Sequence, residues 1–260
     1  MFSDTGDEHD ETYTHLEEMK ILCHQNGIEL VHLTPDLGYH TRFWPSLRAF
    51  YRRTQTCGSK GFKKTCTDNL KIQPIYRFLD AYMGEKYGFK TGLKRGLYQF
   101  TRAWGKIQVL IGFSKREEKR IAKTTQRSKW MTENLHFRFP LLDRGMDRQA
   151  CQSYIRSVGY QIPLPSNCKL CPFISEIELV WLARNYPNDF RDWVKIEAAK
   201  IAKFKHRGKQ NYGVWPKLYK GQPITLNQVL AQAEAKYGHW TDAQLGEYRM
   251  THGHCVVSKC

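Results

Sequence analysis

The sequence predicts a mixed α/β fold with a parallel sheet at its centre. Two short apolar runs rich in branched side chains, residues 28–33 and 106–113, have the composition of buried strands of such a sheet. Residues 11–26 carry apolar side chains at helical spacing, and Gly27 ends this helix. Residues 1–8 read as the end of a strand that enters a polar loop. Strand, helix and strand in this order form an α/β unit.

The C-terminal part of the sequence predicts helices. Residues 149–158 form one candidate helix, and residues 176–185 and 190–205 show apolar side chains three and four positions apart. Pro187 and Asn188 separate the last two helices. We therefore expect two parts, an α/β core over residues 1–175 and a basic helical extension over residues 176–260.

Charge favours a polyanionic partner. The 260 residues include 41 Lys and Arg against 25 Asp and Glu, which gives a net charge of +16. Such a balance favours nucleic acid or nucleotide phosphates, although a basic protein without such a partner is the alternative. The sequence has no apolar run of about 18 residues and begins with an acidic segment, so we expect no membrane partner and a cytoplasmic location.

Basic and aromatic residues alternate within the predicted extension. Basic residues interleaved with stacking aromatics can hold single-stranded nucleic acid, so RNA or DNA is a candidate partner. The candidate nucleic-acid-binding residues are Lys203, Lys205, Arg207, Lys209 and Trp215. An earlier basic stretch, residues 42–77, fits either a surface that faces phosphate or a solvated helix face.

The eight cysteines are spread along the chain, which favours metal binding or catalysis over a disulfide framework. Cys168 and Cys171 are separated by two residues, the spacing of thiolates that share a zinc ion or an iron–sulfur cluster. This pair forms half a site, and Cys57 and Cys66 are the candidates for the other half. A small buried residue is the alternative interpretation of Cys66.

Five segments together resemble a known family. They are residues 2–8, 65–75, 110–120, 139–151 and 163–173. In this order they resemble phosphoadenosine phosphosulfate (PAPS) reductase-like proteins of the PP-loop, or adenine nucleotide alpha-hydrolase, superfamily. The Cys-x-x-Cys-Pro segment is similar to that of the phage and mobile-element branch. The resemblance covers roughly residues 1–175 and implies a parallel-sheet adenine nucleotide alpha-hydrolase-like core.

The resemblance also implies a site. The acidic loop with Asp4, Thr5, Asp7 and Glu8 would lie beside an adenine nucleotide, ATP or PAPS, and its magnesium ion, and Lys71 would meet phosphate or sulfate. The cysteines at 57, 66, 168 and 171 would hold a four-iron cluster in preference to zinc. A solvated helix N-terminus is the alternative interpretation of the acidic loop.

The sequence also departs from the family. The loop Ser-Gly-Gly-x-Asp-Ser, whose amides cradle phosphates, does not occur, so we expect an N-terminally incomplete core or a partner subunit that supplies the loop. Cys255, flanked by His252 and His254, is a candidate nucleophile, and an incidental cysteine in a tail is the alternative.

Three functions follow from these observations. The first is a PAPS-reductase-like oxidoreductase or a nucleotide-dependent sulfur transferase, either active or a former enzyme. The second is a nucleic-acid-associated accessory protein with a structural iron–sulfur or zinc site. The third, a zinc-stabilised structural module, rests on the cysteines alone.

Overall fold

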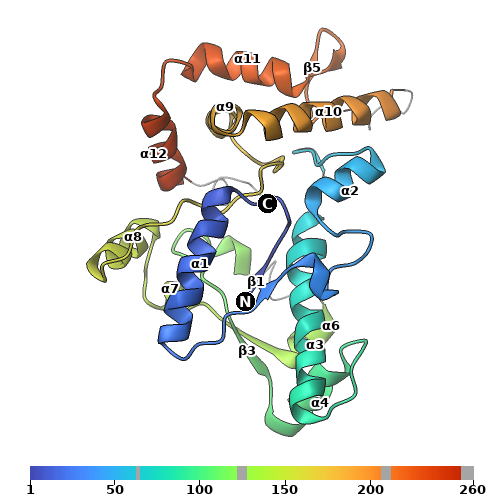
Figure 1. Ribbon diagram of the computed structural model, residues 1–260, viewed down its shortest axis with the longest axis vertical. Coiled ribbons are helices and arrows are strands. Elements are labelled where there is room, and N and C mark those ends of the chain that lie inside the picture. Colours follow the sequence, from blue (N-terminus) through green and yellow to red (C-terminus); the bar gives the residue numbers. More distant parts are fainter. Residues whose placement is uncertain (63–64, 122–127, 206–211, 253–260) are drawn as a thin grey trace. The chain divides into compact units, whose positions relative to one another are not determined.

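The computed structural model describes residues 1–62, 65–121, 128–205 and 212–252 (Figure 1). The chain forms two compact units. Unit 1 combines residues 1–74 with residues 163–260, and unit 2 consists of residues 75–162. This division differs from the predicted boundary after residue 175, because the C-terminal helices share a hydrophobic core with the N-terminal segment.

Unit 1 contains the N-terminal strand and helix, the segment around the cysteines, and the C-terminal helices. Its elements are β1 (Phe2–Ser3), α1 (Asp10–Gln25), β2 (His32–Leu33), the 3-10 turn η1 (Pro35–Leu37), α2 (Leu47–Thr54), the π-helix η2 (Thr67–Ile72), α9 (Glu176–Asn185), α10 (Pro187–Lys203), β5 (Leu218–Tyr219), β6 (Gln222–Pro223), α11 (Leu226–Tyr237) and α12 (Asp242–His252). In Figure 1, α9, α10 and α11 lie together as the orange elements.

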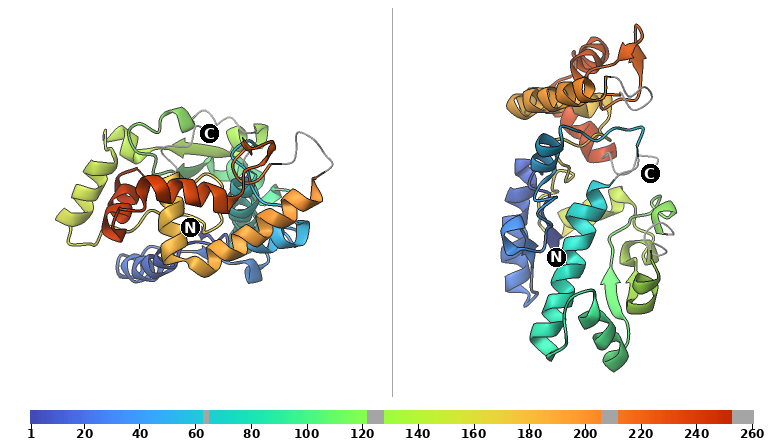
Figure 2. Two further views of the ribbon diagram at one scale, coloured as in Figure 1. Left: turned by 90° about the horizontal axis from the view of Figure 1, so that it is seen from above. Right: turned by 90° about the vertical axis from the view of Figure 1, so that its right-hand side faces the viewer.

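Unit 2 begins within α3 (Gln73–Tyr87), which continues directly from η2. Its remaining elements are α4 (Arg95–Trp104), β3 (Ile107–Leu110), α6 (Lys129–Asn134), β4 (Leu135–Arg138), α7 (Pro140–Asp143) and α8 (Arg148–Ser157). The views of Figure 2 show α4 folded back beside the C-terminal end of α3.

The fold is mixed α/β, as the sequence predicts, and helices predominate. Strands β1 and β2 pair in parallel, with Ser3 opposite Leu33, and β3 pairs in parallel with β4. Strands β5 and β6 form an antiparallel hairpin. In the described residues each of these sheets has two strands, and the predicted run 28–33 is strand only at its end, where Leu33 is fully buried while Ile28 is 60% exposed.

The core of unit 1 explains why the helical region folds onto the N-terminal segment. Helix α9 is buried over Leu179 to Leu182, and Trp193 of α10 is fully buried. They share one apolar cluster with Leu47 of α2 and Leu70 of η2. Ser175 and Glu178 form a capping box at the start of α9, which satisfies two backbone N–H groups that the helix leaves unpaired. The helix predicted over 176–185 is therefore confirmed with the same bounds.

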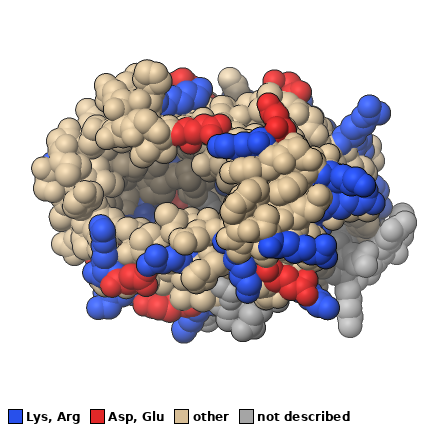
Figure 3. Space-filling model, turned by 90° about the horizontal axis from the view of Figure 1, so that it is seen from below, with Lys and Arg blue, Asp and Glu red and all other residues tan. Residues whose placement is uncertain are grey.

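Charge is distributed unevenly between the two units. Unit 2 contains 18 Lys and Arg against 7 Asp and Glu, whereas unit 1, about twice as long, contains 23 against 18. The net charge is therefore +11 in unit 2 and +5 in unit 1. On the face drawn in Figure 3, Lys and Arg side chains are spread widely, with Asp and Glu side chains beside some of them.

Among the described residues, no helix combines the length and the apolar character needed to cross a bilayer.

Candidate functional site

The acidic loop after β1 is buried. Asp4, Thr5, Asp7 and Glu8 are each less than 10% exposed, so the loop is not a solvated helix end. Backbone bonds place it there: the N–H of Leu47 donates to the carbonyl of Thr5, and the N–H of Asp4 continues the β1–β2 ladder. The carboxylates therefore need partners inside the protein.

Asp4 finds its partners within the N-terminal segment. Its Oδ1 accepts hydrogen bonds from the Tyr13 hydroxyl at 2.8 Å and from the Gly6 N–H at 2.7 Å. The imidazole of His32 lies 3.5 Å from its Oδ2. Burial, together with the nearby Asp4 carboxylate, raises the pKa of Tyr13 well above its usual value, so this phenol stays protonated as a donor. Asp4 is thus occupied by internal contacts.

Asp7 is held by an arginine that the sequence does not single out. Arg48 donates from its backbone N–H and from its Nε to the two carboxylate oxygens of Asp7, each at 2.7 Å. The same guanidinium also contacts Asp189 and Asp192 of α10. Burial raises the pKa of Asp7, and the bonds from Arg48 oppose that rise. This network joins the acidic loop to the helical region and gives each carboxylate oxygen of Asp7 a hydrogen-bond donor.

Glu8 is the centre of a second cluster, which we call the Glu8 cluster: Thr5, Glu8, Lys71 and Cys168. The Oε1 of Glu8 lies 3.0 Å from the Lys71 ammonium, and it accepts from the Thr5 hydroxyl at 3.1 Å and the Cys168 thiol at 3.5 Å. The Glu8 side chain is fully buried, whereas that of Lys71 is 40% exposed. Within the described residues the second oxygen of Glu8, Oε2, has no hydrogen-bond partner.

The surroundings of the Cys168 thiol favour its protonated form. Burial raises the pKa of Cys168 well above its usual value, and the Glu8 carboxylate raises it further, while the Lys71 ammonium opposes both. Thr5 Oγ1 lies 3.3 Å from the sulfur. A thiol of this kind is a poor nucleophile at neutral pH, because the thiolate is the reactive form.

The Glu8 cluster brings together three segments that are far apart in the sequence. Glu8 and Cys168 form an isolated antiparallel bridge, so residues 2–8 lie against residues 163–173. The Ser3 hydroxyl donates to the carbonyl of Leu70 at 2.7 Å, which fixes η2 beside β1. The structure therefore joins three of the five segments that resemble the PAPS reductase-like family.

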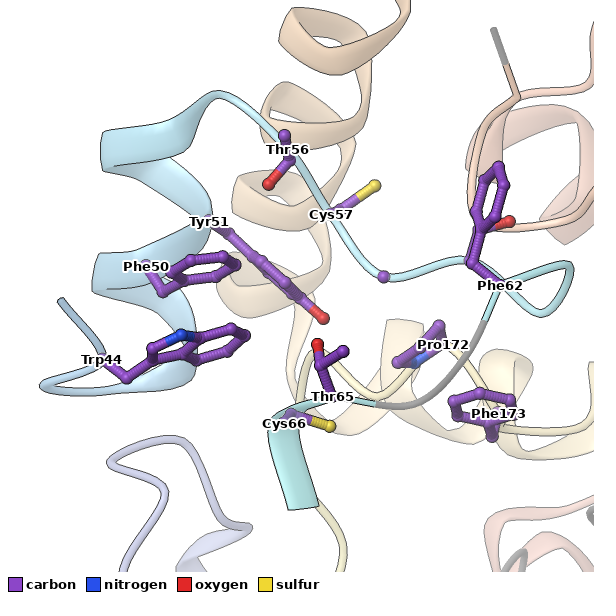
Figure 4. Close-up of a pocket in the computed structure, with 12 residues that line it drawn as sticks. Trp44, Phe50, Tyr51, Thr56, Cys57, Phe62, Thr65, Cys66, Pro172 and Phe173 are labelled. Carbon is purple, nitrogen blue, oxygen red and sulfur yellow. The ribbon is translucent and has the colours of Figure 1, made fainter. Parts of the chain in front are cut away.

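Two of the predicted cysteines, Cys57 and Cys66, line a pocket in the same unit (Figure 4). The cavity measures about 190 Å³, and its walls include Cys57, Cys66 and Pro172 together with the aromatic rings of α2 and its neighbours. Gly58 lies so close to both walls that a Cβ there would be 2.6 Å from Pro172 Cγ and 2.6 Å from the Tyr51 hydroxyl. Segments 57–66 and 168–173 thus meet around Tyr51.

The pKa shift of Tyr51 also indicates that cysteines lie near its hydroxyl. Burial raises the pKa of Tyr51 well above its usual value, and the thiols of Cys66, Cys57 and Cys171 add to the rise. Burial also raises the pKa of Cys57 to about 12, a rise that Lys200 opposes and Glu197 strengthens. All four predicted cysteines belong to, or pack against, the apolar cluster of unit 1.

The residues present fit a metal site only in part. Thiolate sulfur is the donor that zinc and iron–sulfur clusters prefer. In the described part of the chain, however, no three His, Cys, Asp or Glu side chains are grouped as ligands of one metal ion. Figure 4 shows the Cys57 and Cys66 side chains apart from each other, above and below the Tyr51 hydroxyl. The metal site stays a prediction, and we derive no chemical step through it.

Among the predicted nucleic-acid-binding residues that the structure describes, Trp215 offers no open stacking surface. Trp215 is only 6% exposed, because the Lys60 ammonium lies 3.8 Å from its ring centroid and the ring belongs to the core. Lys203 donates to the carbonyl of Thr54, and Lys205 is exposed. Trp215 is therefore a core residue rather than a stacking platform. Arg207, Lys209 and Cys255 lie outside the described residues.

Sequence reasoning missed a second buried contact in unit 1. Arg249 of α12 is 1% exposed, with its guanidinium 3.5 Å from the centroid of the Trp181 ring and its Nη2 2.9 Å from Nδ1 of His9. Burial lowers the pKa of Arg249. An arginine in a helix ordinarily lies on the surface, so the sequence offered no signal for this contact.

No protein-family model, no curated protein and no solved structure matches this chain. The family resemblance of the five segments therefore stays a prediction. Any function has to be argued from the geometry of the Glu8 cluster and the pocket.

Proposed function

We propose that this chain is a PAPS-reductase-like protein that binds an adenine nucleotide bearing a phosphate or sulfate group, with Lys71 as the anion contact. The reaction class is adenylyl sulfate reduction or ATP-dependent adenylation with sulfur transfer. The observation that carries the proposal is the Glu8 cluster, in which three of the family-like segments meet at one lysine. The proposal includes an adenine nucleotide alpha-hydrolase-like core, for which the parallel pairs β1–β2 and β3–β4 are suitable elements.

Lys71 has the properties of an anion contact at the edge of a buried site. Its ammonium is paired with Glu8 on the protein side, yet its side chain is 40% exposed. The buried carboxylate fixes the position of the amine, and its exposed side can donate to a phosphate or sulfate oxygen. Because burial raises the pKa of Cys168 and so disfavours the thiolate, the proposal assigns this side chain no nucleophilic step.

Nucleotide binding tests the proposal. We expect isothermal titration of the full chain with PAPS, adenylyl sulfate and Mg-ATP to detect binding of at least one of them. Lys71→Ala should weaken that binding about ten-fold or more, since hydrogen bonds to charged groups contribute about 1.5–3 kcal/mol. Lys20→Ala is the matched control, because Lys20 is paired with Glu17 and 41% exposed. Binding of none of the nucleotides, or equal loss in both variants, would overturn the proposal.

Metal content tests the four-cysteine prediction separately. If Cys57, Cys66, Cys168 and Cys171 hold a cluster or zinc, anaerobically purified protein will contain stoichiometric iron and sulfide, or stoichiometric zinc. Cys171→Ser should then remove the metal, whereas Cys23→Ser, on α1 and away from the pocket, should keep it. Protein without metal would contradict the ligand set and leave the nucleotide proposal to its own test.

A further inference from the structure

The end of unit 2 carries a concentration of positive charge that the proposed nucleotide site does not use. Residues 86–106 comprise the last residues of α3, a loop and all of α4. We call this segment the α3–α4 tip. It contains Lys86, Lys90, Lys94, Arg95, Arg102 and Lys106 and has no Asp or Glu. It therefore supplies a large share of the +11 charge of unit 2.

Four aromatic rings pack together at the tip and remain partly open to solvent. The Trp104 ring lies 4.9 Å from that of Tyr87, 5.2 Å from Phe100 and 5.6 Å from Phe89, measured between centroids. Trp104 is 59% exposed and Tyr87 38% exposed. A large aromatic side chain this exposed presents part of its π-surface to solvent.

A buried carboxylate fixes the loop of the tip. Asp80 of α3 accepts hydrogen bonds from the N–H groups of Gly92 at 2.7 Å, Gly96 at 2.7 Å and Leu97 at 3.4 Å. Gly96 has to be glycine, because a Cβ there would lie 2.6 Å from the carbonyl oxygen of Asp80. The Asp80 carboxylate thus satisfies the backbone N–H groups at the N-terminus of α4. An anionic ligand of the tip therefore has to bind to side chains.

Three basic side chains of the tip are available for such an anion. Lys90, Arg95 and Arg102 are exposed, and none of them makes a side-chain hydrogen bond or ion pair with a described residue. Arg95 and Arg102 are seven positions apart, so they lie on the same face of α4 about 10 Å apart along its axis. Gln99 of that face donates to the carbonyl of Lys90, which places the loop beside it.

We call Lys90, Arg95 and Arg102 the basic strip, and the rings of Tyr87, Phe89, Phe100 and Trp104 the ring cluster. The two adjoin each other in the sequence and on α4. Phe89 of the cluster is followed directly by Lys90 of the strip, and Phe100 of the cluster follows Gln99. A flexible single strand of nucleic acid whose phosphates bind along the basic strip can therefore stack one of its bases on the ring cluster. Phosphate neutralisation together with base stacking is how proteins hold single-stranded nucleic acid without reading its sequence.

We propose that the α3–α4 tip binds single-stranded nucleic acid, with Lys90, Arg95 and Arg102 contacting phosphates and Trp104 stacking on a base. An anionic membrane fits the tip less well, because Leu93 is its one strongly exposed aliphatic side chain and interfacial binding needs a wider apolar face. This binding lies outside the proposed nucleotide site and does not depend on it.

Charge reversal tests the phosphate contacts. The probe is fluorescein-labelled oligothymidylate of about 16 nucleotides, the upper end of known site sizes per domain, titrated by anisotropy with the full chain. We expect the triple variant Lys90→Glu, Arg95→Glu, Arg102→Glu to bind much more weakly and to reduce the salt slope by about 2, or about 0.7 for each phosphate contact. The matched control reverses three exposed lysines of unit 1, namely Lys195→Glu, Lys217→Glu and Lys220→Glu.

The control separates this surface from general basicity. The two triple variants have the same net charge, so equal losses would show that charge alone, or the helical region of unit 1, holds the strand and would overturn the proposal. Circular dichroism and the thermal midpoint establish that both variants fold. A tip variant that still folds and keeps its affinity would also overturn it.

Trp104 supplies a test that charge cannot mimic. Trp104→Ala should weaken oligothymidylate binding about five-fold or more, because stacking contributes at least about that factor per base. Trp104→Phe keeps a stacking ring and should retain most of the affinity. Sedimentation with phosphatidylserine–phosphatidylcholine vesicles completes the test: if the tip triple variant loses vesicle binding while oligothymidylate binding is unchanged, the surface is a membrane contact and the proposal fails.

Discussion

The two units of this protein treat charged side chains in opposite ways. In its described residues, unit 1 buries both signs of charge, at Asp4, Asp7, Glu8, Glu178, Glu197, Lys200 and Arg249. Asp80 is the one charged side chain that unit 2 buries in the described residues, and most of its many lysines and arginines lie on the surface. Buried charges require partners, whereas exposed charges of one sign attract a polyanion. The comparison assigns an internal polar site to unit 1 and an outward-facing surface to unit 2.

In both units a buried carboxylate accepts hydrogen bonds from backbone N–H groups of a loop. In unit 1, the carboxylate of Glu197 accepts from the N–H groups of Val214 and Leu226. In unit 2, Asp80 accepts from three N–H groups of the tip. Each carboxylate satisfies backbone donors that would otherwise be buried without a partner, and burial raises the pKa of Glu197. A buried carboxylate thus organises a loop in both units.

Two tryptophans give the largest expected contrast between the units. Trp193 of α10 is fully buried, whereas Trp104 of α4 is 59% exposed. We expect Trp193→Ala to lower the free energy of unfolding by about 3–5 kcal/mol, because it leaves a large cavity, and Trp104→Ala to lower it by about 1 kcal/mol or less. Urea unfolding followed by circular dichroism measures both. Similar losses would show that the ring cluster of the tip is core rather than surface.

The Asp80 carboxylate should matter to unit 2 nearly as much. We expect Asp80→Ala to lower the free energy of unfolding by about 2–3 kcal/mol, because three N–H groups near the start of α4 lose their hydrogen-bond acceptor. Asp80→Asn keeps one oxygen and should cost about half as much. The exposed Asp143 is the control, and its replacement by Ala should change stability by less than about 0.5 kcal/mol. A stable Asp80→Ala protein would mean that the loop does not depend on this carboxylate.

The smallest expected effect is a pH dependence that belongs to unit 1. Burial lowers the pKa of Lys60 to about 8, from 10.5. Above pH 8 the folded state has released this proton while the unfolded state still holds it, so Lys60 makes stability rise with pH. Between pH 8 and 9 we expect a contribution of about 1 kcal/mol, near the limit of 1.36 kcal/mol per unit for one proton.

Lys60→Met tests this assignment. The variant keeps an apolar side chain of similar length beside Trp215 and has no titrating amine, so the rise between pH 8 and 9 should disappear. Measurements stop at pH 9 because the Cys57 thiol, whose pKa is about 12 when folded, has the opposite effect above its ordinary value of 9.0. An unchanged slope in the variant would assign the pH dependence to another group.

Particular residues show where prediction from the sequence succeeded. Apolar spacing placed the helix now seen over Asp10–Gln25 to within a residue, and the helix over Glu176–Asn185 with the same bounds. Both have a local cause, a periodic apolar face and residues that end the helix. Cys57, Cys66, Cys168 and Cys171 belong to, or pack against, one apolar cluster of unit 1, and their role as metal ligands stays a prediction.

Other residues show where it failed. The solvated alternative for the carboxylates at 4, 7 and 8 is wrong: the structure buries them, because Arg48, Lys71 and Tyr13 reach them from other elements. Trp215 was predicted as a stacking surface and lies in the core under Lys60. Nothing in the neighbouring residues of these positions marks them as buried.

The sequence by itself determined some of the helices, such as Asp10–Gln25 and Glu176–Asn185, the mixed α/β class and the strongly basic composition, because these depend on local periodicity and on residue counts. Only the tertiary structure decided which charges are buried in pairs and which face solvent. That outcome depends on partners more than a hundred residues away, such as Cys168 for Glu8 and Asp189 for Arg48. The cost of removing a charge from water, and the partner that offsets it, exist only when the chain is folded.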